Sequence, residues 1–387
     1  MRGPGVMEPR HLREFDYLGD AAYLDTASVG MLPQRTLDHC RDFQDAFAAS
    51  YGRLCFGPYG AQRAEAAQKL ARLIGADPDE IMFTRNTTEG SSLLAAGYPL
   101  EPGASVVSAA GEYPSVVLGW AQRQAAGVKL RLVPVKNGVL DPADVLAAMD
   151  ETTKVVALSF VRYESGFRTD LARIGAACRA RGVLFAVDAI QGLGRHPVNV
   201  RELGIDVLSC GGFKGLMAPF GVGFAYVRRD LLPCLTPWAW SDDNVDVDEA
   251  ALGRMASIPA LPLRAGAARL MAGSQNTFGI TALGKSVELL LEIGVENVQA
   301  HVLQLEAAFR DAVQGLPAAL RGGNGPAHWS GNVCMDFDPA RTQAVAEALA
   351  RHQVYARLDT GFLRVSFHCF NTPAHLRRAA QALKEAL

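Results

Sequence analysis

Lys214 stands at the centre of a turn that could bring its amine close to a ligand. The turn lies in Asp206 to Gly223, where an apolar run leads into the lysine and glycine and proline follow it; such a backbone can turn sharply and approach a ligand closely. Upstream, Asp188 and Gln191 end another apolar run. A lysine that forms a Schiff base and an aspartate that pairs with a pyridinium nitrogen are the side chains that pyridoxal 5'-phosphate needs. This pattern predicts that Lys214 and Asp188 are catalytic, the alternative being a surface lysine on a loop.

A polar stretch, NTTEG, separates an apolar strand from a helix and could hold a phosphate. Thr87 and Thr88 stand just ahead of Gly90, which opens the helix. Because the first N–H groups of a helix are unpaired and lie at the positive end of its dipole, hydroxyls there make a phosphate cradle. The alternative is an ordinary helix cap made by Thr88 with nothing bound. Because Asp188 and Lys214 also indicate pyridoxal 5'-phosphate, we favour the interpretation that this stretch holds the phosphate.

In this order the motifs resemble the class V aminotransferases of fold type I, which include cysteine desulfurases, selenocysteine lyases, kynureninases and isopenicillin N epimerase-like enzymes. The resemblance runs from YLDTASVG at Tyr23 to FHCFNT at Asn371. It implies a pyridoxal 5'-phosphate enzyme, a homodimer with a composite active site, and an α/β fold. That fold has a large domain with a mainly parallel seven-stranded sheet and a small α/β C-terminal domain.

The resemblance also implies roles for single residues around the cofactor. Tyr113 matches the residue that stacks on the cofactor ring, and Tyr163 or Gln191 would bond its phenolic oxygen. Ser274 matches a contact to the phosphate of the neighbouring subunit, although the alternative for this segment is a simple helix cap made by Asn276 or Thr277. For Tyr113 alone, packing at a strand end is the alternative to stacking.

An arginine near the C-terminus matches the family residue that binds a substrate α-carboxylate. Arg364 precedes FNT on an expected strand, and Arg357 is the weaker rival. A planar guanidinium can hold a carboxylate through two parallel hydrogen bonds. A surface arginine on a strand is the alternative.

The sequence departs from the desulfurases at three places. Phe213 and Gly211 stand where desulfurases have histidine and serine, and no cysteine lies between Val354 and Arg364, where their nucleophile is placed. Since a persulfide requires a thiolate on a mobile loop, we expect that none forms, with Cys334 and Cys369 packed in core strands.

Short Val-rich runs predict a mainly parallel sheet buried on both faces; they are 129–135, 153–161, 182–190, 206–211 and 222–229. Helical spacing covers 34–47, 62–74 (after a break at GPYG), 142–149, 170–179 and 281–314, with an interruption at Gly294. Strand, helix, strand and helix follow in 329–387. We expect an N-terminal arm at 1–22, a large cofactor domain at 23–262, and an interdomain helix with a small domain at 263–387. The irregular segment 236–262 is typical of substrate-specific structure.

The composition of the chain limits the kinds of partner that we expect it to bind. The formal charge is −2, so no basic field favours nucleic acid, and no run of about 18 apolar residues indicates a membrane span. Seven cysteines without paired spacing indicate neither a disulfide framework nor a metal site. We expect a soluble cytoplasmic protein whose substrate is a small molecule, an amino acid.

Three functions are compatible with these residues. The first is β-elimination, typically of sulfur, by a C–S lyase without a catalytic cysteine, and the second is transamination or epimerisation on the same scaffold. The third is a non-catalytic cofactor-binding regulator, for which the N-terminal 22 residues are too short to supply a DNA-binding module.

Overall fold

The computed structural model describes residues 7–53, 58–247, 249–257, 259–271, 273–323 and 325–387. Its largest element is a seven-stranded sheet in the order β2-β8-β7-β6-β5-β3-β4. The strands are β2 (Ile81–Thr84), β3 (Ser105–Ala109), β4 (Lys129–Val133), β5 (Thr153–Ser159), β6 (Leu184–Asp188), β7 (Val207–Gly211) and β8 (Gly223–Val227). Within it β8 runs antiparallel to both neighbours, β2 and β7, and the other pairs are parallel. The predicted mainly parallel sheet is confirmed.

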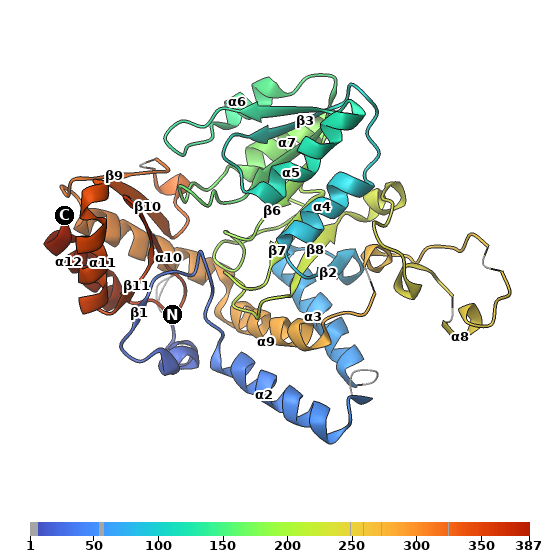
Figure 1. Cartoon of the computed structure of the whole chain (residues 1–387), viewed down its shortest axis with the longest axis horizontal. Coiled ribbons are helices and arrows are strands. Elements are labelled where there is room, and N and C mark those ends of the chain that lie inside the picture. Colours follow the sequence, from blue (N-terminus) through green and yellow to red (C-terminus); the bar gives the residue numbers. More distant parts are fainter. Residues whose placement is uncertain (1–6, 54–57, 248, 258, 272, 324) are drawn as a thin grey trace.

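Helices cover both faces of this sheet (Figure 1). One face packs on α4 (Thr87–Gly97) and α5 (Pro114–Gln122), and the other on α3 (Pro58–Ile74), α6 (Pro142–Ala148), α7 (Leu171–Arg181) and α9 (Thr277–Ile293). Alternate residues of β5 therefore enter different cores: Val155 faces α4 and α5, and Val156 faces the other layer. Burial is least complete at the edge strand β4, where Leu132 is 51% exposed.

A second, smaller sheet is built from the C-terminal part of the chain. Its order is β12-β13-β10-β9, formed by β9 (Ala318–Leu320), β10 (Asn332–Phe337), β12 (Arg357–Asp359) and β13 (Phe362–Ser366), all antiparallel. The helices α10 (Val295–Ala312), α11 (Thr342–Arg351) and α12 (Pro373–Ala386) pack with it. The strands β9, β11 and β12 were not predicted, because two or three residues carry no readable period.

The N-terminal segment joins this smaller sheet region rather than the large one. The strand β1 (Ala22–Tyr23) pairs in parallel with β11 (Val354–Tyr355), and Phe15 packs on Phe370 with tilted rings whose centroids lie 4.7 Å apart. The chain then crosses to the large sheet through the segment that ends at Gly30. The division into 1–22, 23–262 and 263–387 stays a prediction.

One helix boundary differs clearly from the sequence prediction. α2 (Gln34–Ala49) lies close to its predicted range, but α3 begins at Pro58, so residues 58–60 of the predicted break form the start of the helix. Proline suits the first turn because the N–H it lacks would be unpaired there. Gly294, with φ +81°, separates α9 from α10 as expected.

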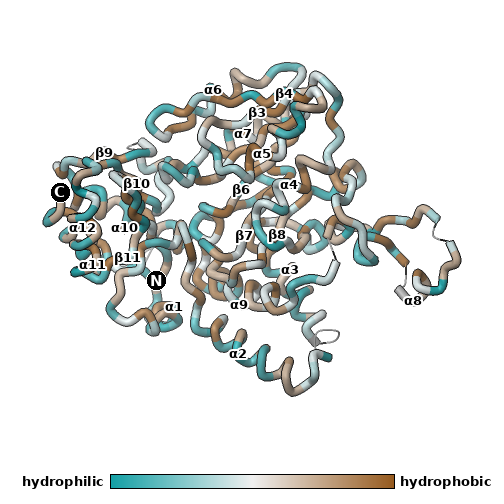
Figure 2. Tube along the Cα trace, in the orientation of Figure 1, coloured by the Kyte–Doolittle hydropathy of each residue, from teal (hydrophilic) through white to brown (hydrophobic). Residues whose placement is uncertain are grey.

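Short helical turns complete the chain: α1 (Pro9–Leu12), η1 (Arg13–Leu18), η3 (Pro78–Glu80), η4 (Arg123–Ala126), η5 (Arg229–Cys234), η6 (Asp242–Asn244), α8 (Glu249–Leu252), η7 (Ala267–Leu270), η8 (Pro326–His328) and η9 (Pro339–Arg341). Around α8 the chain forms a projecting segment, residues 245–263, which extends away from the body in Figure 1 and is closed at its base by the bridge of Val245 to Leu263. In Figure 2, hydrophobic residues gather in the inner strands and hydrophilic ones on α11 and α12. Across the described residues, no helix combines the length and apolarity that a membrane span needs.

Candidate active site

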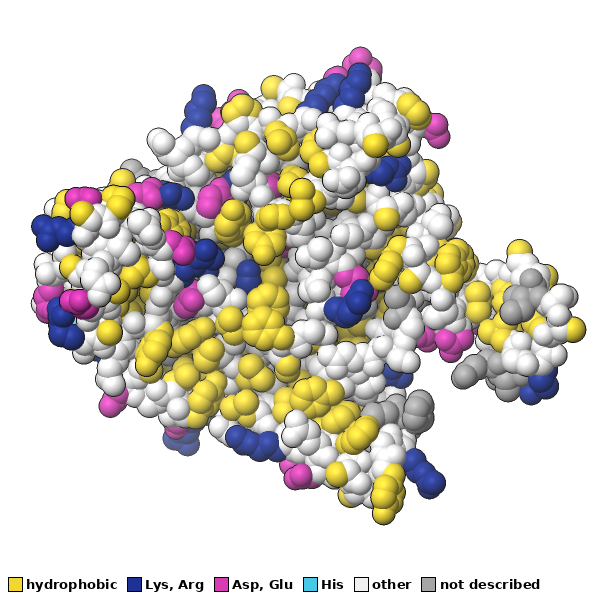
Figure 3. Space-filling model, viewed as in Figure 1, with side chains coloured by type: hydrophobic (Ala, Val, Ile, Leu, Met, Phe, Trp, Pro, Cys, Tyr) yellow, Lys and Arg dark blue, Asp and Glu magenta, His cyan; other side chains and the backbone are white. Residues whose placement is uncertain are grey.

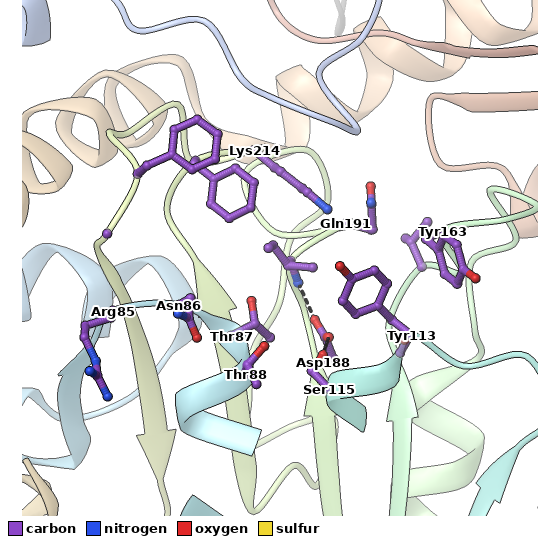
Figure 4. Close-up of a pocket in the computed structure, with 16 residues that line it drawn as sticks. Arg85, Asn86, Thr87, Thr88, Tyr113, Ser115, Tyr163, Asp188, Gln191 and Lys214 are labelled. Atoms are coloured by element: carbon purple, nitrogen blue, oxygen red, sulfur yellow. Dashed lines mark hydrogen bonds between the residues drawn. The ribbon is translucent and has the colours of Figure 1, made fainter. Parts of the chain in front are cut away.

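A cavity of about 320 Å³ opens at the carboxyl ends of β5 and β6, beside the first turn of α4. Ligands bind at this edge in open α/β sheets. The cavity brings together most of the predicted cofactor residues, Thr87, Thr88, Tyr113, Tyr163, Asp188, Gln191 and Lys214 (Figure 4).

Lys214 and Asp188 form the electrostatic centre of this cavity. Burial lowers the pKa of the Lys214 amine, and the Asp188 carboxylate partly opposes that shift. Burial raises the pKa of Asp188, although the Ile190 N–H donates to its Oδ1 at 3.0 Å. Ser115 Oγ lies 3.5 Å from the other oxygen, Oδ2. A buried carboxyl of this kind favours a cationic partner, such as a protonated pyridine nitrogen.

The turn that carries Lys214 is held by backbone hydrogen bonds within it and by one from the N-terminal segment. Within the turn, Met217 N donates to Lys214 O at 2.9 Å, and Gly212 N donates to Val222 O at 2.8 Å. From the N-terminal segment, Gly30 N donates to Phe213 O at 2.7 Å. A β-carbon at Gly30 would lie 2.0 Å from Lys214 O, so only glycine fits beneath the lysine.

At the other end of the cavity, α4 begins with the NTTEG stretch. Asn86, not Thr88, caps the helix: its Oδ1 accepts from Glu89 N at 3.0 Å. The alternative in which Thr88 caps is therefore wrong, and the exposed Thr88 side chain remains at the cavity wall. Thr87 is buried, and its Oγ1 accepts from Gly211 N at 2.8 Å. Accepting there leaves the Thr87 hydroxyl proton for a further acceptor.

Two tyrosines and a glutamine line the side of the cavity opposite α4. The rings of Tyr113 and Tyr163 meet edge to face, with centroids 5.4 Å apart. Gln191 Nε2 donates to Ala27 O at 3.0 Å, and Asn332 Nδ2 donates to Gln191 Oε1 at 3.4 Å. One Nε2 proton of Gln191 remains for an anionic oxygen.

Arg364 is buried on β13 with a guanidinium that is only partly satisfied. Its Nη2 donates to Ser28 Oγ at 2.7 Å and lies 3.5 Å from Asp25 Oδ1, and its Nη1 donates to Tyr163 O at 3.2 Å. Its Nε is buried and has no hydrogen-bond partner among the described residues. Arg357 instead pairs with Asp359 at the surface, at 2.8 Å. Of the two arginines, Arg364 keeps donor capacity for a carboxylate.

Ser274, like Arg364, is a predicted site residue that does not line this cavity. Its side chain is exposed just ahead of α9, where Asn276 caps the helix through its Oδ1, which accepts from Gly279 N at 2.9 Å. Asn276 Nδ2 also donates to Gly221 O at 2.9 Å. The contact of Ser274 with a neighbouring subunit stays a prediction.

Two buried charged groups behind the cavity were not predicted to be buried. Glu112 accepts from Ser159 N at 3.0 Å and lies 3.5 Å from Arg162 Nη1, and burial raises its pKa. Arg195 donates to Asn332 Oδ1 at 2.6 Å and to Gln191 O, and burial lowers its pKa to about 9. Arg195 lies on a segment without a motif, whereas Glu112 directly precedes Tyr113, so the sequence indicated its position but not its burial.

No cysteine lines the cavity within the described ranges. Cys334 is buried on β10, and burial raises its pKa to about 12. Cys369 is also buried, but β13 ends at Ser366, so this cysteine lies in the turn that follows and not on the strand that the alternation predicted. Cys55 lies outside the described residues.

Comparison with known proteins decides the family. The model of the family "Aminotransferase class-V" matches residues 22–378. The chain belongs to the class V aminotransferases. Among curated relatives, a probable cysteine desulfurase of Methanothermobacter thermautotrophicus is 28% identical over 96% of both chains. An uncharacterized aminotransferase of Schizosaccharomyces pombe is 28% identical over 85% of this chain and 83% of its own.

Solved structures share the fold. An apo cysteine desulfurase from Thermococcus onnurineus NA1 superposes with a TM-score of 0.86 at 22% identity, covering 99% of each chain. The cystine C–S lyase C-DES, solved with its product cysteine persulfide, gives 0.84 at 22% identity, covering 96% of this chain and 99% of its own. The protein therefore has the fold type I architecture and is a pyridoxal 5'-phosphate-dependent enzyme.

The residues present fit this cofactor. Lys214 supplies a buried amine, and Asp188 a buried carboxyl that a cation would stabilise. Thr87 and the start of α4 supply a free hydroxyl proton and unpaired N–H groups for a phosphate. The assignment of these residues to the cofactor rests on their placement and is a proposal.

Proposed function

We propose that the protein catalyses β-elimination from an amino acid, as a C–S lyase that works without a catalytic cysteine. The observation that carries this proposal is the Lys214 amine, buried with Asp188 in a cavity whose lining holds neither histidine nor cysteine among the described residues. Pyridoxal 5'-phosphate, when bound, supplies an electron sink for the carbanion at Cα. The protein must then supply a base, a carboxylate anchor and a fixed ring position.

Lys214 is the proposed base. Because burial lowers its pKa, a larger fraction of the amine is neutral near pH 7 than for a free lysine. The neutral Nζ can accept the α-proton and, once protonated, can donate a proton to the departing sulfur. Phe213, the neighbouring residue, cannot take part in either transfer, so the amine serves both.

Arg364 is the proposed anchor for the α-carboxylate. Its unpartnered Nε and the fork geometry of guanidinium suit a planar anion. Ser28 and Asp25 hold the other side of the group, which orients it before substrate arrives. Tyr113 and Tyr163 would then confine the ring and the substrate between the anchor and the base.

Transamination on the same scaffold is the second candidate, favoured by the relative called an aminotransferase. The two are separated by products: the holoenzyme, incubated with a panel of amino acids, should release pyruvate and ammonia. A keto acid that retains the substrate side chain, formed with conversion of the cofactor to its amine, would indicate transamination instead. Lys214→Ala should abolish either reaction, and Lys129→Ala, at an exposed site on the edge strand β4, is the matched control.

A homodimer with composite active sites is proposed for the assembly. The projecting segment, residues 245–263, stands clear of the body and leaves Met255 exposed, while Trp240 at its approach is 64% exposed. Figure 3 shows further hydrophobic side chains in a band across the face between the two sheets. Apolar surface of this kind favours a second copy. Sedimentation at working concentration tests it, and a fully active monomer would contradict it.

The free cysteines, scattered without paired spacing, support a cytoplasmic location.

A further inference from the structure

Two aromatic pairs flank the amine at which a substrate would react. Phe213 and Phe220 stack with centroids 4.5 Å apart and ring planes at 22°, and Tyr113 and Tyr163 meet edge to face. Lys214 Nζ lies 5.5 Å from the Phe213 ring centroid and 6.0 Å from that of Tyr113. In Figure 4, Tyr113 and Tyr163 lie together beyond the end of the Lys214 side chain.

The fold itself does not use all of this aromatic surface. Phe220 is 64% exposed and Tyr113 is 47% exposed, although both line the cavity. Near the cavity, buried polar side chains such as Thr87 and Gln191 stabilise the fold through hydrogen bonds with the backbone. When a ligand covers exposed apolar surface beside a reactive group, the removal of that surface from water favours binding.

The charged groups of the cavity lining are each engaged before a substrate arrives. Within the described lining they are Arg85, Asp188 and Lys214. Arg85 pairs through its Nε with Glu89 at 3.0 Å, and its guanidinium lies over the Trp238 ring, 5.8 Å from the centroid; the other two are assigned to the cofactor. An ionic side chain would therefore lose hydration next to the aromatic rings without an uncommitted charge to pair with.

From this lining we infer that the substrate carries an apolar β-substituent and is an S-alkyl- or S-arylcysteine. The inference rests on the proposed β-elimination and narrows it to one class of thioether. The Cα–H and Cβ–S bonds break, the proton from Cα goes to Lys214 Nζ, and the sulfur leaves with its electron pair and takes a proton. One water completes the reaction, so that R–S–CH₂–CH(NH₃⁺)–COO⁻ and H₂O give RSH, pyruvate and NH₄⁺, with no change of oxidation state that needs a further reagent.

Binding of amino acids that lack a leaving group tests the inference on the holoenzyme. Calorimetric titration with 2-aminobutyrate, norvaline and norleucine should show the dissociation constant falling about fourfold for each added methylene, the value for a fully buried CH₂. Homoserine, the polar isostere of norvaline, should bind at least about tenfold more weakly, because its hydroxyl loses water without finding a partner. In turnover, kcat/KM for S-benzylcysteine should exceed that for cysteine by about tenfold or more.

Two variants assign the effect to the phenylalanine pair. Phe220→Ala and Phe213→His should flatten the dependence on chain length, whereas Leu118→Ala, an exposed residue of α5 outside the cavity, should preserve it. Equal binding of homoserine and norvaline, or a preference for cysteine, would overturn the inference. The inference would also be overturned if Phe220→Ala weakens self-association but leaves the dependence of binding on chain length unchanged, since Phe213 and Phe220 would then pack on a second copy of the chain. If no amino acid binds at all, the proposed β-elimination itself fails.

Discussion

Replacing Gly30 with alanine should misplace the reactive lysine without touching the cavity. The added β-carbon would lie 2.0 Å from Lys214 O and 2.9 Å from Lys214 C, whereas real β-carbons essentially never approach closer than 3.0 Å. Both atoms belong to the backbone, so no flexible side chain can move aside. The Lys214 turn and the segment of Gly30 must separate by about 1 Å, which also strains the hydrogen bond from Gly30 N to Phe213 O.

The expected loss follows from that displacement. A misplacement of about 1 Å in a catalytic group costs about 10²-fold in rate, and overpacking typically costs about 1–3 kcal/mol of stability. We therefore expect Gly30→Ala to fold, to keep the cofactor, and to lose about 100-fold in kcat. Steady-state kinetics, the cofactor absorbance and a urea unfolding curve measure the three quantities.

The control is Gly325→Ala, where an added β-carbon meets nothing within 4 Å. This variant should match the wild type in rate and in unfolding midpoint. If Gly30→Ala turns over within about threefold of the wild type, the close approach of the two backbones does not position Lys214, and the reasoning is refuted.

Four further predictions follow from the site and its surroundings. Borohydride reduction of the holoenzyme should fix the cofactor on Lys214, and a label mapped to any other lysine would contradict the assignment. Arg364→Lys should raise KM by about 10- to 100-fold with a smaller effect on kcat, because a charge-assisted hydrogen bond to the substrate, of about 1.5–3 kcal/mol, is lost; an unchanged KM would place the carboxylate elsewhere. After incubation with cysteine, mass spectrometry should find no adduct of one sulfur on a cysteine that activity requires. Burial lowers the pKa of His196 and of His368 to about 3, below the unfolded value of about 6.5, so the folded state binds fewer protons; stability is complete above that value and should fall by roughly 1.4 kcal/mol per pH unit for each histidine as the pH drops below it, which pH-dependent denaturation measures.

The sequence predicted the sheet and the centre of the site because both follow local rules. Val-rich runs such as 153–161 have the composition of strands buried on both faces, and β5 occupies most of that range. Asp188 ends one such strand and Lys214 follows another after two intervening residues, and the carboxyl ends of strands in an open sheet meet at one edge. To predict that Lys214 and Asp188 lie close together, it was therefore enough to predict the order of the strands in the sheet.

What the sequence did not predict depends on contacts between distant segments. Gly30 and Lys214 touch only because the N-terminal segment crosses beneath the turn, and nothing near Gly30 signals that crossing. Arg195 is an arginine on a loop, typical of a surface, yet it is fully buried and donates to Asn332 of the smaller sheet. Tertiary burial overrides local composition at both positions.

The β12–β13 hairpin and the Phe213 side chain bear on the same step of the proposed reaction. The hairpin joins its strands through a short turn at Gly361, whose N–H donates to Thr342 Oγ1 at 3.0 Å and whose carbonyl accepts from Phe337 N at 3.0 Å. Neither this turn nor the strands beside it carry a cysteine, so in the proposed reaction the sulfur would leave together with its substituent. Phe213 would offer that leaving group apolar contact and no proton. The proton would then come from Lys214 after it has received one from Cα, so a single nitrogen would account for both transfers that the proposed elimination requires.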